Sequence, residues 1–504
     1  MSERYSRAKV ITRAAGVLLV AGMVAGHAPP AGAQTGSSAR KTAAADHWVP
    51  TWGTAQQLIR TATPPPAGRG QVPTTSAPAG APSTQSATAT QAPSATPGTQ
   101  PAATSPSQGA ATQPPAATGG GVPFRVTTLA NQTVRMILRT SIGGHRARVK
   151  LSNAFGSAPV LVGAAHIARR GTGSSIVAGS DRALSFAGKP SFTMMPGVVV
   201  VSDPVDLDVP ALGDLAVSLF VPADTGNPTT HATGLRPTYV STEGDFTGQS
   251  DFPLAGTTQQ YYWLSSVEVS APADAWAIVA FGDSITDGAR STPDTNNSWP
   301  ALLAARLGAN KATASIAVVN EGIGGNRLLT DATGLAGVSA LARFDRDVLS
   351  HPGVKWLMIL EGINDIGTLG APTPPAVPIT GDDLIWVLQQ AIDRAHAHGI
   401  KVVGCTLTPY EGAGYARENG EAIRDTVNRW IRTSGAFDAV VDFEAATRDP
   451  SNLKRFKPDF DPGDHLHPND AAAELVRRYL AEHQASLTAD EIGWVEACAS
   501  GSAQ

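Results

Sequence analysis

The pattern of apolar and polar positions is typical of strands over roughly residues 124 to 269. Short runs alternate apolar and polar side chains, and Gly, Pro and Asp residues separate them. Such period-2 runs are typical of antiparallel strands with one buried face. The pattern predicts an all-β domain with a sandwich or jelly-roll architecture. The expected strands are an early one at 47–54 and later ones at 133–140, 146–152, 198–201, 214–221 and 260–264.

The pattern changes at Trp276, where continuous apolar runs begin to alternate with helix-like segments. This alternation predicts an α/β unit with a parallel sheet and helices on both faces. The expected strands are 277–281, 316–320, 356–360, 401–406 and 439–442. The expected helices are about 299–307, 339–349, 381–398, 417–433 and 470–483.

Between residues 61 and 122 the composition is dominated by Pro, Ala, Thr, Ser, Gln and Gly. Such a segment cannot bury enough apolar surface to offset its chain entropy, and we predict a disordered insertion. Two interpretations remain open. The segment is either a linker or glycosylated spacer, or a tolerated surface insertion, and the ordered sequence on both sides favours the second.

The first 33 residues have the features of a secretory signal peptide. Basic residues precede an apolar stretch at 14–25, and Ala31-Gly32-Ala33 is a small-residue cleavage site. A retained membrane anchor is the alternative, but the stretch is shorter than the ~17 to 20 residues that span a bilayer. We therefore predict a secreted or periplasmic protein without stable membrane insertion, with a polar stretch at 34–46 after the signal.

Composition narrows the classes of partner and cofactor. The 504 residues are 42% hydrophobic and 16% charged, with a net charge of −4. These values are typical of a globular protein, and no dense basic cluster indicates a nucleic acid as partner. No group of residues has metal-ligand spacing, so we predict no metal and no cofactor. The two cysteines, Cys405 and Cys498, form a disulfide or stay as unpaired thiols, and both options are open.

Candidate chemistry begins where the apolar run 277–281 meets the polar turn Gly282-Asp283-Ser284. Ligands of parallel sheets bind outside the carboxyl ends of the strands, which is where Ser284 is expected. The structural alternative is that Asp283 and Ser284 only cap the following helix.

Four short motifs in a fixed order favour the chemical interpretation. They are Gly-Asp-Ser-Ile-Thr-Asp-Gly at 282–288, Asn-Glu-Gly-Ile-Gly-Gly-Asn at 320–326, Glu-Gly-Ile-Asn-Asp at 361–365 and Asp-His-Leu-His-Pro-Asn at 464–469. Together they resemble the four blocks of the SGNH (GDSL) hydrolase superfamily, over roughly residues 276 to 486. The resemblance implies a flavodoxin-like α/β/α fold and a serine esterase without a cofactor.

The resemblance also assigns roles to residues. It implies that Ser284 is the nucleophile, that His467 is the general base, and that Asp464 orients the imidazole. The implied oxyanion donors are the backbone N–H groups of Ser284 and Gly325 and the side-chain amide of Asn364.

Several neighbouring residues have a structural interpretation that we weigh against a catalytic one. His465 is the alternative base, but it matches no block position. Asp283, Asp287 and Asp365 are expected to bind backbone N–H groups in tight turns. Asn326 and Arg327 are expected to hold a loop, and Trp299 is expected to pack in the core.

The domain boundaries expected from these features are a first strand at 47–60, a β-domain at 123–272, an SGNH domain at 273–486 and a tail at 487–504. A β-domain before an SGNH domain resembles the arrangement of some bacterial carbohydrate esterases, which implies an esterase that acts on short-chain, above all acetyl, esters of carbohydrate. The alternatives are a lipase or lysophospholipase, and a non-catalytic secreted carbohydrate-binding protein. The β-domain either binds carbohydrate, shapes one wall of the catalytic cleft or is purely structural, and the motifs leave the oligomeric state open.

Overall fold

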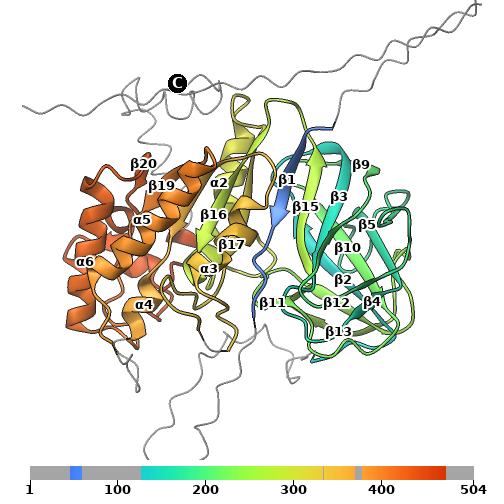
Figure 1. Ribbon diagram of the computed structural model, residues 1–504, viewed down its shortest axis with the longest axis horizontal. Coiled ribbons are helices and arrows are strands. Elements are labelled where there is room, and N and C mark those ends of the chain that lie inside the picture. Colours follow the sequence, from blue (N-terminus) through green and yellow to red (C-terminus); the bar gives the residue numbers. More distant parts are fainter. Residues whose placement is uncertain (1–45, 59–126, 333, 369–376, 473–504) are drawn as a thin grey trace, which may run out of the picture. The chain divides into compact units, whose positions relative to one another are not determined.

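The computed structural model describes residues 46–58, 127–332, 334–368 and 377–472. Within these residues an antiparallel β-sandwich is followed along the chain by a parallel α/β unit, as Figure 1 shows. The predicted fold class is therefore confirmed.

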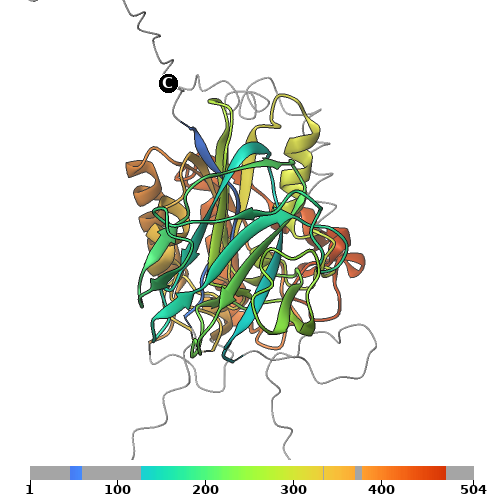
Figure 2. The same ribbon diagram turned by 90° about the vertical axis from the view of Figure 1, so that its right-hand side faces the viewer.

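The sandwich consists of two antiparallel sheets, and Figure 2 shows its strands from the side. One sheet has the order β1-β15-β3-β8, with β9 also paired to β3; the other has the order β13-β12-β2-β10-β5-β6. The first sheet comprises β1 (Trp48–Gly53), β3 (Gly144–Ser152), β8 (Val199–Val201), β9 (Val205–Val209) and β15 (Leu264–Ser270). The second comprises β2 (Gln132–Arg139), β5 (Ala164–Arg169), β6 (Arg182–Ala183), β10 (Asp214–Val221), β12 (Thr238–Glu243) and β13 (Leu254–Thr258). Two further strand pairs are β4 (Val160–Val162) with β7 (Phe192–Met194), and β11 (Thr230–His231) with β14 (Tyr261–Tyr262).

The burial of β3 differs from the simple alternation that its sequence predicts. Its last four residues, Val149 to Ser152, are all buried. The reason is that this sheet is covered on both sides. Its residues share a core with Ala277 and Ala317 of the α/β unit, and the Nζ of Lys150 donates a hydrogen bond of 3.1 Å to the Ser350 carbonyl.

The α/β unit is built on a five-stranded sheet with the order β17-β16-β18-β19-β20, and every neighbouring pair is parallel. Counted along this unit, the order is 2-1-3-4-5, which is the flavodoxin-like arrangement. All seven residues of β16 are buried, as the continuous apolar run predicts. The strands are β16 (Trp276–Gly282), β17 (Ile316–Gly322), β18 (Val354–Leu360), β19 (Lys401–Cys405) and β20 (Ala439–Val441).

Helices connect these strands, and four lie close to their predicted positions. The predicted helix at 339–349 is divided into an α-helix and a π-helical turn, Asp345–Leu349. The α-helices are α1 (Ser284–Asp287), α2 (Trp299–Ala309), α3 (Ala340–Phe344), α4 (Ile363–Gly367), α5 (Gly381–Ala397), α6 (Glu418–Thr433) and α7 (Phe443–Thr447). A hairpin of β21 (Arg448–Asp449) and β22 (Asn452–Phe456) and a 3-10 turn at Pro458–Phe460 follow.

The sandwich packs against the α/β unit at the strand that precedes the glycine-rich motif. Strand β1 lies along β17. The backbone N–H of Val318 in β17 donates to the hydroxyl of Ser141 at 3.1 Å, and Arg346 donates to the Gln56 carbonyl at 3.4 Å. Residues of the sandwich are therefore placed close to the carboxyl end of β17.

Several predictions lie outside the described residues: the signal peptide at 1–33, most of the polar stretch at 34–46, the insertion at 61–122, the tail at 487–504, and the helix at 470–483 beyond Ala472. Cys405 is a buried free thiol, and Cys498 is outside the described residues. No helix in the described part is long and apolar enough to cross a membrane. The described residues contain no cluster of three or more His, Cys, Asp or Glu side chains that could hold a metal ion.

Candidate active site

Ser284 is the first residue of the short helix α1, directly after the buried strand β16. Asp283 caps this helix, and its Oδ1 accepts a hydrogen bond of 2.9 Å from the Ile285 N–H. The turn is too tight for a side chain at Gly282, because a Cβ there would lie 2.2 Å from the Leu360 carbonyl oxygen. The local sequence thus holds Ser284 at the carboxyl end of the sheet, where it is 8% exposed.

The structure brings Ser284, His467 and Asp464 together in one line of hydrogen bonds. The Nε2 of His467 lies 2.8 Å from the Ser284 Oγ, and its Nδ1 lies 2.9 Å from the Asp464 Oδ2. A carboxylate only accepts hydrogen bonds, so Nδ1 carries the proton and Nε2 accepts from the Ser284 hydroxyl. In this tautomer the imidazole can take a proton from the serine.

Asp464 is held as an anion by its surroundings. Its Oδ1 accepts the N–H groups of Leu466 and His467, and its Oδ2 accepts from the Arg290 Nε at 2.6 Å as well as from His467. Partial burial would raise the pKa of Asp464, but the bonds from the His467 side chain and backbone, and from Arg290, hold it far below its usual range. The sequence reasoning missed Arg290, and the only available signal was its position six residues after Ser284.

The alternative base, His465, is placed away from Ser284. Its Nδ1 bonds to the Asp461 Oδ2 at 2.5 Å, its side chain is 47% exposed, and its backbone has a positive φ of 59°. The ring packs against Gly412, where a Cβ would lie 2.9 Å from the His465 Cγ. The structure therefore pairs His465 with a different aspartate from the one that pairs with His467.

The other implied oxyanion donors come from two loops. Gly325 has a φ of +76°, a conformation that glycine adopts without strain. Among the described residues, neither the Ser284 N–H nor the Gly325 N–H has a hydrogen-bond acceptor. The Asn364 Nδ2 donates one bond of 2.9 Å to the Asn326 carbonyl, and an amide nitrogen has a second N–H to offer.

Asp283, Asp287 and Asp365 bind backbone N–H groups, as predicted. Asp283 accepts from Ile285, Asp287 accepts from Gly324 at 3.1 Å, and the two oxygens of Asp365 accept from Leu328 and Leu329 at 2.7 and 2.9 Å. Burial raises the pKa of Asp283 to about 7 and that of Asp365 to about 6. The predictions for Asn326 and Trp299 are also confirmed. The Asn326 amide bonds the Ala336 and Val338 carbonyls within its loop, and Trp299 is 5% exposed in the core.

A buried arginine that the sequence reasoning missed ties two of the motifs together. Arg343 on α3 is fully buried and stacks on the Phe281 ring at 4.1 Å. It donates hydrogen bonds of 2.7 to 2.8 Å to the Gly282 carbonyl, the Glu321 carbonyl and the Asn326 Oδ1. These partners lie at the ends of β16 and β17 and in the glycine-rich loop. Arg343 therefore fixes the backbone on which the site is built.

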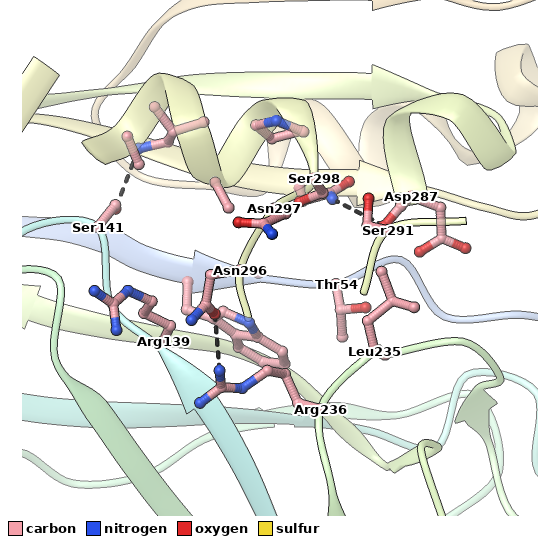
Figure 3. A pocket seen from close by; sticks show the side chains of 18 of the residues that line it. Thr54, Arg139, Ser141, Leu235, Arg236, Asp287, Ser291, Asn296, Asn297 and Ser298 are labelled. Atoms are coloured by element: carbon pink, nitrogen blue, oxygen red, sulfur yellow. Dashed lines mark hydrogen bonds between the residues drawn. The ribbon is translucent and has the colours of Figure 1, made fainter. Parts of the chain in front are cut away.

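A pocket with a volume of about 120 Å³ lies between the sandwich and the α/β unit. Figure 3 shows that polar side chains surround it, among them Arg139, Arg236, Asn296 and Asn297. The Arg236 guanidinium donates to the Asn296 Oδ1 at 2.9 Å. Asp287 contributes to the lining, whereas Ser284 does not. The pocket is therefore a neighbour of the site and not the site itself.

Comparison with known proteins identifies the class of the α/β unit. Residues 280–475 match the model of the GDSL-like lipase/acylhydrolase family, and this span contains Ser284, Gly325, Asn364, Asp464 and His467. The chain thus carries a hydrolase domain of the GDSL type. The matched span is less than half of the chain, and it identifies this α/β unit as a GDSL-like domain of a carboxylic ester hydrolase.

Solved structures similar to the chain are hydrolases, and each covers less than half of it. An acetylxylan esterase from Geobacillus stearothermophilus is 21% identical and covers 41% of this chain and 93% of its own, with a TM-score of 0.33. An α/β hydrolase enzyme from the metagenome of Lake Arreo, Spain, is 20% identical and covers 43% of this chain and 98% of its own, with a TM-score of 0.32. A GDSL-like lipase from Bacteroides thetaiotaomicron is 16% identical and covers 42% of this chain and 89% of its own, with a TM-score of 0.30. The comparison with curated proteins gave no match.

Proposed function

We propose that the protein is a secreted serine esterase in which Ser284 is the nucleophile, His467 the general base and Asp464 the residue that orients His467. The observation that carries this proposal is the continuous line of hydrogen bonds from Asp464 through His467 to Ser284. Export rests on the signal-like first 33 residues.

Acylation begins when the Ser284 Oγ attacks the ester carbonyl and its proton passes to the His467 Nε2. Asp464 stabilises the imidazolium that forms, because its carboxylate already accepts the Nδ1–H. The tetrahedral intermediate then collapses. The bond from the carbonyl carbon to the alkoxy oxygen breaks, the alcohol leaves with the proton from Nε2, and an acyl-enzyme remains on Ser284.

Deacylation repeats these steps with water. His467 takes a proton from a water molecule, which attacks the acyl carbonyl, and the second tetrahedral intermediate releases the acid and restores the Ser284 hydroxyl. In both halves we assign the oxyanion to the N–H groups of Ser284 and Gly325 and to the free N–H of Asn364. Such fixed donors are worth the most in a site with little water.

We also propose that the substrate carries a short acyl group, acetyl above all, on a polar alcohol such as a sugar hydroxyl. A small pocket of about 20 Å³ adjoins Ile285 and Pro468, the neighbours of Ser284 and His467. Neither Ser284 nor His467 lines this pocket, so its volume does not by itself set the length of the acyl group. Polar residues of the larger pocket next to Asp287 support a hydroxylated alcohol.

Two polar residues of the motifs give no support to a sugar substrate. Asn326 and Asp365 are polar residues of the motifs, but both are fully buried and occupied by bonds within their loops. They are therefore not free to bind a sugar.

A lipase or lysophospholipase is the second candidate, since it would use the same three residues. Its distinguishing feature would be an apolar channel for the acyl chain. The match of residues 280–475 to a hydrolase family and the hydrogen bond between His467 and Ser284 favour an enzyme over the non-catalytic alternative.

The test is kcat/KM on p-nitrophenyl esters from acetate to decanoate. For an acetyl esterase, kcat/KM should fall beyond about four carbons. For a lipase, kcat/KM should rise with every added CH₂, because burying each CH₂ contributes ~0.8 kcal/mol of binding free energy. A maximum at about eight or more carbons would select the lipase.

Ser284→Ala should lower kcat by about 10⁴- to 10⁶-fold. Ser434→Ala, at the end of α6, is the matched control. Wild-type turnover by folded Ser284→Ala would show that Ser284 is not the nucleophile.

A further inference from the structure

A second histidine–aspartate pair joins the β-sandwich to the α/β unit beside Ser284. His231 in β11 places its Nε2 3.0 Å from the Asp287 Oδ1, and Asp287 is the last residue of α1. The pair is deeply buried, with side-chain exposures of 3% for His231 and 6% for Asp287. Sequence reasoning could not find this pair, because the two residues lie 56 positions apart and His231 belongs to no motif.

Both nitrogens of His231 are occupied as donors. Its Nδ1 lies 2.8 Å from the Ala55 carbonyl, which only accepts, and its Nε2 faces a carboxylate. Burial by itself lowers the pKa of His231, but the charge and hydrogen bond of Asp287, together with Ala55, raise it overall. Glu321 is the other charged group that faces it. This imidazole is therefore a buried cation with no free nitrogen, and it has no capacity to act as a base.

The sandwich holds His231 in a fixed place. Strand β11 pairs with β14, and the ring centroid of Tyr261 in β14 lies 6.4 Å from that of His231. The next residue, Ala232, donates its N–H to the Gln57 Oε1 at 2.6 Å, and the Gln57 N–H bonds back to the Thr230 carbonyl. The segment after β1 and the strand β11 thus support the imidazole from both sides.

Asp287 links this support to two parts of the proposed catalytic machinery. Through the chain it ends the four-residue helix that begins with Ser284. Through its Oδ2 it accepts the Gly324 N–H, and the next residue is Gly325, the proposed oxyanion donor. The fit is tight, because a Cβ on Gly322 would lie 2.2 Å from the Asp287 backbone nitrogen. A displacement of the Asp287 carboxylate would therefore move the oxyanion loop.

We propose that His231 is a positioning residue of the esterase: by holding Asp287, it fixes the Gly324–Gly325 loop so that the Gly325 N–H stays directed at the oxyanion. The β-sandwich then completes the active site and is more than a structural partner. This inference rests on the proposed function, in which Ser284 and Gly325 act on an ester.

The first test removes the imidazole. His231→Ala in the full chain should lower kcat on p-nitrophenyl acetate by about 10- to 100-fold, because displacements near 1 Å cost up to about 10² in rate. KM should stay within about twofold, since the lost contact acts on the transition state. His166→Ala is the matched control. His166 makes a similar bond of 2.8 Å to Asp181 elsewhere in the sandwich, and its loss should leave kcat unchanged.

A second test separates positioning from folding. Asp287→Asn can keep both bonds if His231 becomes neutral: the amide donates to Nε2 and its oxygen accepts from Gly324. We expect it to retain kcat within about fivefold, whereas Asp287→Ala should match His231→Ala. The double variant His231→Ala/Asp287→Ala should be no slower than either single variant, because the two residues act as one unit.

Two outcomes would overturn the inference. One is that folded His231→Ala keeps wild-type kcat; His231→Phe, which fills the space but has no donor for Asp287, replaces it if the alanine variant does not fold. The other is that the losses of the two single variants multiply in the double variant. The failure of the proposed function looks different, since Ser284→Ala would then remain active. If Ser284→Ala is inactive and the His231 variants are fully active, only the positioning role is wrong.

Discussion

The two ends of helix α1 each meet a histidine–aspartate pair, and the two pairs differ in what they leave free. At the first residue, Ser284, the pair of His467 and Asp464 uses one imidazole nitrogen for the carboxylate and leaves the other for the serine hydroxyl. At the last residue, Asp287, the pair with His231 uses both imidazole nitrogens for fixed protein acceptors. The same two residue types therefore form a proton acceptor in one place and a rigid tie in the other.

The two histidine–aspartate pairs also differ in how far their side chains are exposed. The side chains of His467 and Asp464 are 16% and 21% exposed, so substrate and water can reach them. Those of His231 and Asp287 are 3% and 6% exposed. A buried ion pair is costly to desolvate and contributes little net stability, but removing one partner leaves an uncompensated charge. The buried pair is thus suited to fixing geometry, and the partly exposed pair is suited to moving a proton.

The largest effect is expected when the two imidazoles of the motif at 464–469 are removed one at a time. His467→Ala should lower kcat by about 10⁴- to 10⁶-fold, the usual cost of losing a triad base. His465→Ala should keep kcat within about threefold, because that ring bonds Asp461 and not Asp464. The measurement is kcat on p-nitrophenyl acetate for folded variants. The reverse order of losses would make His465 the base and leave the His467 pair as a structural element.

This difference also shows what could be predicted from the sequence. Asp464 and His467 lie three residues apart, so one short motif holds the whole pair, and the resemblance to a known family marks it. His231 and Asp287 come from two different units, and only folding brings them together. Period and composition predicted the fold class and most strands, because a continuous apolar run such as that of β16 is buried along its whole length.

Arg290 and Arg343 show a further limit of sequence reasoning. A charged residue in a turn or on a helix is usually solvated, and nothing local distinguishes these two. Arg343 is buried because two carbonyl oxygens at the ends of β16 and β17 and the amide oxygen of Asn326 in the following loop converge on its guanidinium. The division of the predicted helix at 339–349 into α3 and a π-helical turn occurs directly after this residue. Such features depend on tertiary contacts, which periodicity does not encode.

The comparison is sharpened by a variant that leaves both histidine pairs intact. Asn364→Ala should lower kcat by about 10²- to 10³-fold, the effect of losing one oxyanion donor, with little change in KM. Asn452→Ala is the matched control, because its amide bonds Glu411 in the hairpin of β21 and β22. An unchanged kcat in Asn364→Ala would mean that only the two backbone N–H groups stabilise the oxyanion. The position of the Gly325 N–H, which we assign to His231, would then matter more for the rate.

The smallest expected effect concerns Arg290, which binds the Asp464 oxygen that also accepts from His467. Arg290→Gln should lower kcat by about fivefold, since a partly exposed ion pair is worth up to about 1 kcal/mol. Arg455→Gln, which breaks a similar pair with Glu411, is the control and should leave kcat unchanged.

The Arg290 variant should also change the dependence of Tm on pH. The pKa of Asp464 is lowered in the folded protein, so its ionised form stabilises the fold above the unfolded value of about 3.9. That contribution is lost as the pH falls through the folded pKa. Because Arg290 supports only the ionised form, the Tm deficit of Arg290→Gln should be full at pH 7 and should shrink as the pH falls below about 4. Thermal unfolding from pH 7 to pH 3 measures this. A deficit that grows toward acid would mean that Arg290 stabilises the fold through a partner other than Asp464.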